Sequence, residues 1–266
     1  MHPMLKQCDV YAMPASIFHA SFKARPFWWE AHAPEALPEV MLPKSARVVV
    51  VGAGYAGLSA ALELTALGLD CIVLDANEPG FGASTRNGGM VSGGVNVGKR
   101  YMSKPLPAER SVPFLADAAD AFSLVEDLIA REKIACGWTK SGYFLGAWCK
   151  SHFNDMAKKV ALLNEAADSG SYLVPQDRQR EEIGSDYYRG GMVVTRSAHL
   201  HPALFFKGLL DICLKRGVQI ASKTPVIKLT ESTTGWTVET PRGNIAAGDV
   251  IIAKNGYTGD ATPQFK

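Results

Sequence analysis

Three glycines and one acidic residue form the part of this sequence whose types and spacing could do chemistry. Gly52, Gly54 and Gly57 are spaced as Gly-x-Gly-x-x-Gly, and Asp75 follows eighteen positions after the last of them. In such a motif the first glycine permits a tight turn, the second lets the backbone approach a diphosphate, and the third allows a helix to pack closely on a strand. A carboxylate at this distance accepts hydrogen bonds from a ribose. The pattern predicts a site for a dinucleotide.

The flanking residues predict the elements that position these groups. Residues 48–51 are four valines, typical of a buried strand, and a helix is expected to run from the glycines to about Leu67. A second short strand, 71–74, then ends on Asp75. The N-terminus of the helix offers unpaired N–H groups and the positive end of its dipole to phosphates. Strand, glycines, helix, strand and acid in this order indicate a complete β-α-β unit, which is stronger evidence than the glycines alone.

Composition limits the class of protein. The chain has 266 residues, 47% of them hydrophobic and 20% charged, which is typical of one large or two modest soluble domains. Its net charge of +2 argues against nucleic-acid binding, and its most apolar stretch, 48–62, is too short to span a bilayer. Five dispersed cysteines and the lack of a secretory signal favour a reducing, cytoplasmic location. Neither the cysteines nor the histidines have ligand spacing, so no metal site is predicted.

The residues before the first strand predict an extended arm, 1–45. Five prolines between Pro14 and Pro43 disfavour a helical domain there. The aromatic cluster Phe27-Trp28-Trp29 is expected to pin this arm onto the body of the protein, with partner binding as the alternative.

The remainder alternates between helical and strand patterns. Helices are expected at 114–132, 153–167 and 202–216, and an irregular polar stretch at 175–189. Strands are expected at 142–148, 191–195, 218–221 and 250–253, with an antiparallel meander at 226–229, 236–239 and 244–246. Tyr143, Phe144 and Trp148 are expected in the core of a small sheet. The order of elements predicts an α/β fold, α+β overall, whose last strand returns to the first sheet.

Four segments of this chain resemble a known family. They are VVVVGAGYAGLSAALEL, GFGASTRNGGMVSGG, HLHPALFFKGLL and VIIAKNGYTGD. Together they make residues 27–259 similar to the FAD-dependent oxidoreductases of the D-amino-acid oxidase type, and most similar to the bacterial branch of gamma-glutamylputrescine oxidoreductase-like enzymes. The second segment is the most specific of the four.

The resemblance implies a Rossmann-type FAD-binding domain with an inserted, incomplete substrate domain. Its segments would be 46–110 and 196–266 for the FAD-binding domain and 111–195 for a helical and strand insertion that includes part of the substrate domain. The implied cofactor-binding residues are Gly52, Gly54, Gly57, Asp75, Ser84, Thr85, Arg86, Asn87, Gly88, Gly89, Val226, Ala253, Asn255 and Gly256. Asp75 stands where the family more often has Glu, and Lys254 where it usually has Thr.

The implied chemistry is oxidation of a C–N bond in a small amine or amino acid by hydride transfer to flavin N5. Because the cofactor carries that step, no residue is assigned a catalytic role. Histidine is a common acid/base group in enzymes, but His199 and His201 are expected to be structural. Family members continue well beyond Asn255-Gly256, so the chain is expected to be a truncated product or one half of a split protein with a complementing chain.

Three functions remain open at this point. The first is a working flavin amine oxidoreductase. The second is a catalytically incompetent fragment that retains the dinucleotide-binding motifs. The third is a nicotinamide-dependent dehydrogenase, against which the loop 80–89 argues, because a simple NAD domain does not need it.

Overall fold

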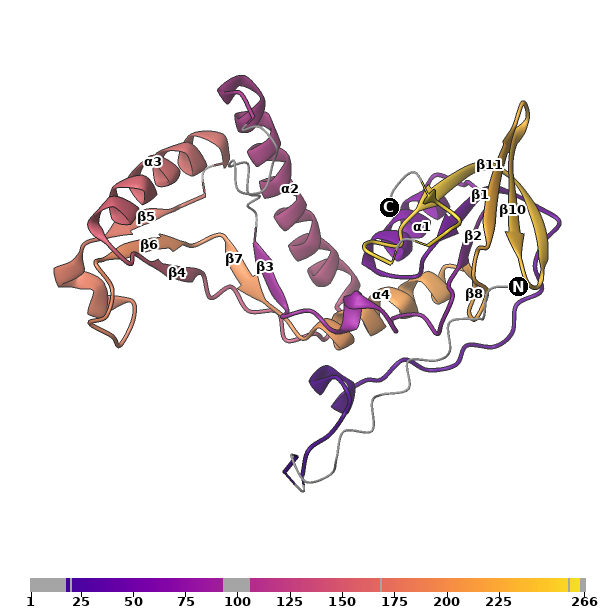
Figure 1. Cartoon of the computed structure of the whole chain (residues 1–266), viewed down its shortest axis with the longest axis horizontal. Coiled ribbons are helices and arrows are strands. Elements are labelled where there is room, and N and C mark those ends of the chain that lie inside the picture. Colours follow the sequence, from indigo (N-terminus) through magenta and orange to yellow (C-terminus); the bar gives the residue numbers. More distant parts are fainter. Residues whose placement is uncertain (1–17, 20, 93–105, 168, 258, 264–266) are drawn as a thin grey trace.

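The computed structural model describes residues 18–19, 21–92, 106–167, 169–257 and 259–263. Residues 1–17 and 20 of the expected arm, and 93–105 of the expected first FAD-binding segment, lie outside this part. The described chain forms two parts (Figure 1). One contains a six-stranded sheet with helices α1 and α4, and the other contains helices α2 and α3 with a three-stranded sheet.

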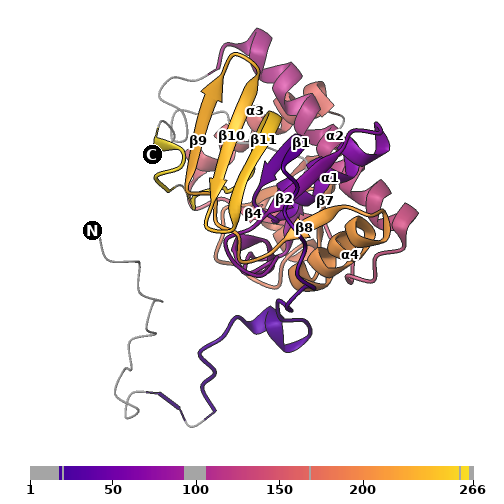
Figure 2. The ribbon, with the colours of Figure 1, turned by 90° about the vertical axis from the view of Figure 1, so that its right-hand side faces the viewer.

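The six-stranded sheet has the order β8-β2-β1-β11-β10-β9, and its strands lie side by side in Figure 2. Strands β8, β2, β1 and β11 are parallel, whereas β11, β10 and β9 are antiparallel. The bounds are β1 Ser45–Val51, β2 Cys71–Leu74, β8 Gln219–Ala221, β9 Lys228–Ser232, β10 Gly235–Thr240 and β11 Gly243–Ile252. This arrangement confirms the expected α/β fold with a parallel sheet.

Strand β11 corrects the predicted end of the sheet. The sequence suggested two strands, 244–246 and 250–253, separated at Gly248-Asp249, but the structure has one continuous strand, Gly243–Ile252. It pairs antiparallel with β10 through its first half and parallel with β1 through its second. The meander and the parallel strands are therefore one sheet. Val226 is not in a strand either, because β9 begins only at Lys228.

Alternate valines of β1 enter two different cores. Val48 and Val50 pack with α1 (Tyr55–Ala66) and α4 (Pro202–Lys215), where Phe206 and Leu209 are fully buried. Val49 and Val51 face the opposite side. Because successive side chains of a strand point to opposite faces, the four consecutive valines of β1 are buried on both faces of the sheet.

The second part contains two long helices and a small sheet. Helix α2 (Ala108–Glu132) packs on α3 (Lys150–Ala167), and the antiparallel sheet has the order β4-β6-β5, with β4 Tyr143–Gly146, β5 Tyr172–Val174 and β6 Gly191–Val194. A two-stranded ribbon, β3 (Met90–Ser92) with β7 (Ser197–His199), is a separate sheet. Short 3₁₀ helices are η2 (Phe27–Glu30), η3 (Ala83–Thr85) and η4 (Gln176–Glu181).

Several expectations for this part were incomplete or wrong. Helix α2 begins six residues earlier than predicted and includes Pro113, whose lost hydrogen bond is outweighed by burial of Leu115 and Phe122 along the helix. Trp148, expected in the core, lies just after β4 with 65% of its surface exposed. The strands β3, β5 and β7 were not predicted. No helix in the described ranges is long and apolar enough to cross a membrane.

Candidate cofactor-binding site

The carboxyl ends of the four parallel strands meet at one edge of the large sheet. Gly52 follows β1, Asp75 follows β2 and Ala253 follows β11. Backbone bonds fix these positions, with Gly52 N donating to Leu74 O at 2.8 Å and Ala253 N donating to Val51 O at 2.8 Å. Ligands of open α/β sheets bind outside the carboxyl ends of the strands, so this edge is the candidate site.

The three motif glycines form a close-packed cradle there. Gly52 has φ +110°, and a Cβ on it would lie 2.6 Å from the carbonyl oxygen of Ala253. A Cβ on Gly57 would lie 1.8 Å from Gly52 O, so only glycine allows α1 to approach β1 this closely. Gly54 differs, because its hypothetical Cβ would meet only the Ser84 hydroxyl, at 2.9 Å. Gly52 and Gly57 are thus required by packing, whereas Gly54 leaves room at the surface of the turn.

Helix α1 begins beside Ser84. Gly54 is the N-cap and provides no side-chain cap, and the N–H of Tyr55 instead donates to Ser84 Oγ at 3.0 Å. Burial raises the pKa of Tyr55 to about 12, so its hydroxyl stays protonated and donates to the Pro202 carbonyl at 2.9 Å. The helix start is therefore held from both sides, and its first-turn N–H groups form an anion-binding end.

Asp75 is bound to the glycine-rich turn itself. Its Oδ2 accepts a hydrogen bond from Ala53 N at 2.7 Å, and its Oδ1 accepts one from Asn77 N at 2.9 Å. Burial raises the pKa of this carboxyl, and the two backbone bonds oppose that effect. Because each carboxylate oxygen can accept two hydrogen bonds, Asp75 retains capacity for ribose hydroxyls.

The loop 80–89 packs against the cradle through Ser84 and is folded by its own side chains. Thr85 is buried and donates to Gly80 O at 2.6 Å. Asn87 accepts from Gly89 N at 2.9 Å and donates to the carbonyls of Ala83 and Ser84. Gly89 has φ +72° with Leu200 O directly behind it, whereas Gly88 is exposed with nothing near a hypothetical Cβ.

Two residues of the aromatic cluster contact this loop. The sequence predicted that the cluster pins the arm onto the body of the protein, and Trp28 and Trp29 make such contacts, whereas Phe27 is 70% exposed. Trp28 Nε1 donates to Asn87 O and Trp29 Nε1 donates to Thr85 Oγ1, each at 2.8 Å. The guanidinium of Arg86 lies 4.7 Å from the ring centre of Trp29 and 4.5 Å from that of Phe81. Arg86, which the resemblance placed along the diphosphate, is thus exposed and lies against two neighbouring aromatic rings, whose centres are 6.0 Å apart.

The turn after β11 reaches the same edge. Asn255 has φ +52°, and its Oδ1 accepts from Gly256 N at 2.8 Å. Lys254, the departure from the family pattern, donates from Nζ to the buried hydroxyl of Thr262 at 3.1 Å, and burial lowers its pKa. Its side chain is therefore tied to the segment that follows the turn.

Other candidates lie elsewhere. Val226 packs against the second core, and the backbone contact with the adenine that the resemblance implies for it stays a prediction. His201 is the N-cap of α4, where Nδ1 accepts from Leu204 N at 3.3 Å, and His199 Nδ1 lies 3.2 Å from Ser141 Oγ. Both histidines have structural contacts, as expected.

Two residues near the site were missed by the sequence reasoning. Tyr55 joins the helix start to α4, and Thr224, fully buried, donates from its N–H to Asp75 O at 2.7 Å. Thr224 had a signal in the sequence, because it closely follows the strand expected at 218–221, and ligands of open α/β sheets bind at the carboxyl ends of strands. Tyr55 had none, since its partner is 147 positions away.

The cradle fits a dinucleotide diphosphate. A side chain at Gly54 would occupy the surface of the turn, the helix start lacks its own side-chain cap, and a carboxylate stands at the end of β2. Fold and site together define a dinucleotide-binding α/β protein. The chain belongs to the family described as FAD dependent oxidoreductase (DAO), which matches residues 47–266.

Curated relatives support this membership. The chain is 32% identical over 224 residues to the "Probable oxidoreductase OrdL" of Haemophilus influenzae, covering 83% of this chain and 51% of that protein. It is 30% identical over 220 residues to the gamma-glutamylputrescine oxidoreductase of Escherichia coli, covering 80% of this chain and 50% of that protein. The chain therefore spans about half the length of these relatives.

Solved structures share the fold. The glycine oxidase of Geobacillus kaustophilus superposes with a TM-score of 0.70 at 17% identity, covering 84% of this chain and 59% of that one. An L-amino acid deaminase of Proteus vulgaris superposes with a TM-score of 0.68 at 21% identity, covering 85% of this chain and 57% of that one. At these identities the likeness establishes the fold and not the substrate.

Proposed function

We propose that this chain binds FAD at the carboxyl edge of its large sheet and contributes the cofactor-binding half of an oxidoreductase acting on an amine or amino acid. When bound, FAD would supply the acceptor at N5 for a hydride from the carbon next to the amine nitrogen. The resulting imine would hydrolyse in water to a carbonyl compound and a free amine or ammonia. The residues of this chain would bind and orient the cofactor.

The observation that carries the proposal is the meeting of Gly54, Ser84 and the Asp75 carboxylate around the start of α1. Gly54 and the first-turn N–H groups of α1 would receive the diphosphate, and Asp75 would receive the ribose. The loop 80–89, held by its internal hydrogen bonds and by the arm, would follow the cofactor toward its flavin ring. The relatives are named as oxidoreductases, one of them acting on gamma-glutamylputrescine, which favours an amine as substrate.

The domain division follows as part of the proposal. Segments 46–110 and 196–266 would form the FAD-binding domain, and 111–195 would belong to the substrate domain. The large sheet and the β4-β6-β5 sheet are separate, which supports this division. Because the alignment covers only about half of each matched relative, we propose that turnover requires the polypeptide that corresponds to their other half, linked to this chain or separate.

Gly54→Ala is the sharpest test of cofactor binding. Gly54 does not have a positive φ, and its new Cβ would meet only the movable Ser84 hydroxyl, so the variant is expected to fold. The added methyl would still keep a diphosphate from the turn. Titration of the FAD-free protein with FAD, followed by flavin fluorescence, should show affinity reduced at least about tenfold, the loss of roughly 1.4 kcal/mol.

The matched control is Gly184→Ala, at an exposed glycine with nothing within 4 Å of a hypothetical Cβ. It should bind FAD as the wild type does. Failure of the wild type to bind FAD, or equal binding by Gly54→Ala, contradicts the proposal. Bleaching of the visible flavin bands by an added amine would show that the bound flavin accepts a hydride from the amine, whereas a bound but unreactive flavin would identify a binding half alone.

A further inference from the structure

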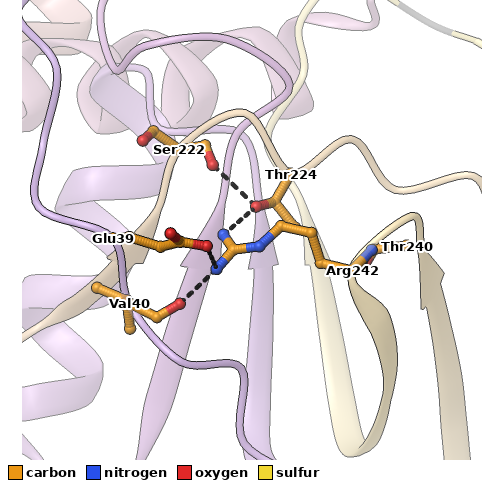
Figure 3. Close-up of polar contacts among 6 residues, drawn as sticks. All are labelled: Glu39, Val40, Ser222, Thr224, Thr240 and Arg242. Atoms are coloured by element: carbon orange, nitrogen blue, oxygen red, sulfur yellow. Dashed lines mark hydrogen bonds and ion pairs between the residues drawn. The ribbon is translucent and has the colours of Figure 1, made fainter.

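Arg242 joins three segments that are far apart in the sequence (Figure 3). It lies in the turn between β10 and β11, where its N–H donates to Thr240 Oγ1. Its Nη1 donates to Thr224 Oγ1 at 2.8 Å, and its Nη2 donates to Val40 O at 2.6 Å and to the Glu39 carboxylate at 3.0 Å. The guanidinium thus connects the hairpin, the arm and the loop after β8.

Thr224 continues this connection toward the candidate site. It is fully buried, and its Oγ1 donates to Ser222 O at 2.8 Å while accepting from Arg242. Its N–H donates to Asp75 O at 2.7 Å, and the neighbouring Lys223 N–H donates to Asn77 O at 3.1 Å. Two backbone bonds therefore join the loop after β8 to the loop that carries the Asp75 carboxylate.

The last link is the Asp75 carboxylate, which accepts from Ala53 N inside the glycine-rich turn at 2.7 Å. A continuous set of hydrogen bonds thus runs from Arg242 through Thr224 and Asp75 to Ala53. Every donor and acceptor in it belongs to a described residue, and the segments it joins come from four different places in the chain.

We propose that Arg242 is a positioning residue of the cofactor site, which holds the Asp75 loop in place through Thr224 without touching the cofactor. The proposal rests on the proposed FAD binding. The planar guanidinium suits this task, because its donors are fixed in a fork that reaches a hydroxyl on one side and a carbonyl on the other. A lysine ammonium at the same position cannot reproduce that geometry.

The three contacts of Arg242 do not contribute equally. Glu39 is 84% exposed at its side chain, so this ion pair is largely screened by water. Thr224, by contrast, is buried, and a hydrogen bond from a charged donor to a buried group contributes more. The contact with Thr224, and not the ion pair, is therefore expected to hold the site.

The test compares Arg242→Met and Arg242→Lys with Arg47→Met and Glu39→Gln. Arg47 is an exposed arginine of the same sheet, with a single ion pair at 3.9 Å to Asp249, and serves as the matched control. Two measurements are made on each protein. The first is FAD affinity by fluorescence titration, and the second is hydrogen exchange of the Lys223 and Thr224 amides in the FAD-free protein, with the β1 amides as reference.

Arg242→Met should weaken FAD binding about tenfold and speed exchange at Lys223 and Thr224 while leaving β1 protected. Arg242→Lys should resemble Arg242→Met in FAD affinity and in amide exchange. Both controls, Arg47→Met and Glu39→Gln, should resemble the wild type in these two measurements. Thr224→Val should weaken binding similarly, and the double variant Arg242→Met/Thr224→Val should be no weaker than the more affected single variant, because both act through one path.

Additive losses of FAD affinity in the double variant would overturn the proposal, since the two residues would then act independently. Amide exchange that rises equally throughout the sheet in Arg242→Met would also overturn it, since Arg242 would then act on general stability. Unchanged FAD affinity in Arg242→Met would also overturn it. A wild-type protein that does not bind FAD contradicts the proposed function instead. In that case unchanged exchange at Thr224 in Arg242→Met still refutes the link to the Asp75 loop.

Discussion

Trp29 and Thr85, separated by 56 positions in the sequence, are joined by a hydrogen bond of 2.8 Å from the indole Nε1 to the threonine Oγ1. Thr85 is buried and its hydroxyl donates a hydrogen bond to Gly80 O, so the arm and the loop 80–89 share one hydrogen-bonded path. The same indole supports one side of the Arg86 guanidinium. The arm is thus part of the structure that shapes the candidate cofactor loop.

Trp29→Phe should therefore lower the free energy of unfolding of the FAD-free protein by about 1 kcal/mol, because the ring remains but its donor is lost. Urea denaturation measures this change. Trp28→Phe is the matched control: its lost bond goes to the exposed Asn87 carbonyl, which water can satisfy, so the effect should be smaller. Equal losses in the two variants would contradict this ranking.

Gly57→Ala should be strongly destabilising, by about 3 kcal/mol or more. A Cβ at this position would lie 1.8 Å from the carbonyl oxygen of Gly52, so α1 must move away from β1. Thermal unfolding of the FAD-free protein checks the prediction. Gly184→Ala, whose surroundings are open, should keep the wild-type melting temperature. A Gly57→Ala protein as stable as the wild type would show that the two elements do not pack as closely as described.

The stability of the FAD-free protein should depend on the ionisation of Asp75. Burial raises the pKa of this carboxyl in the folded protein above its ordinary value of 3.8. At pH values between 3.8 and the raised pKa, the folded state therefore binds more protons than the unfolded state. The contribution of Asp75 to stability is therefore fully present below 3.8 and is lost as the pH rises through the raised pKa. Asp75→Asn removes this titration. Urea unfolding across the acidic range should show a wild-type stability that falls relative to Asp75→Asn as the pH rises, and parallel curves would refute the assignment.

Lys254 should make stability rise with pH in the alkaline range, whereas Asp75 makes it fall with pH in the acidic range. Burial lowers the pKa of its ammonium below 10.5, so the unfolded state binds more protons and stability rises with pH between the lowered value and 10.5. Lys254→Met keeps most of the side-chain volume and removes the charge. Its unfolding free energy should lack this rise, and the difference from the wild type should be largest near neutral pH. A wild type and variant that respond identically to alkaline pH would exclude an effect of burial on Lys254.

Much of the candidate site could be predicted from the sequence, because its residues lie close together along the chain. The glycines, α1, β2 and Asp75 lie within one β-α-β unit, where the spacing of apolar residues and the demands of a tight turn act over a few residues. The resemblance extended this reading to the loop 80–89 and the turn at Asn255. The prediction of two strands was wrong at residues 247–249, because pairing of Ala247 and Asp249 with β1 keeps β11 extended there.

By itself the sequence determined the parallel β-α-β unit, the glycine cradle and its acidic partner, since these depend on neighbouring residues and on backbone conformations that only glycine adopts. The tertiary structure alone decided that Trp29 holds Thr85, that Arg86 lies against the rings of Trp29 and Phe81, and that Arg242 reaches Asp75 through Thr224. Such contacts join side chains from distant segments. Their partners are set by how the sheet brings strand ends together, and no local pattern in the sequence records that.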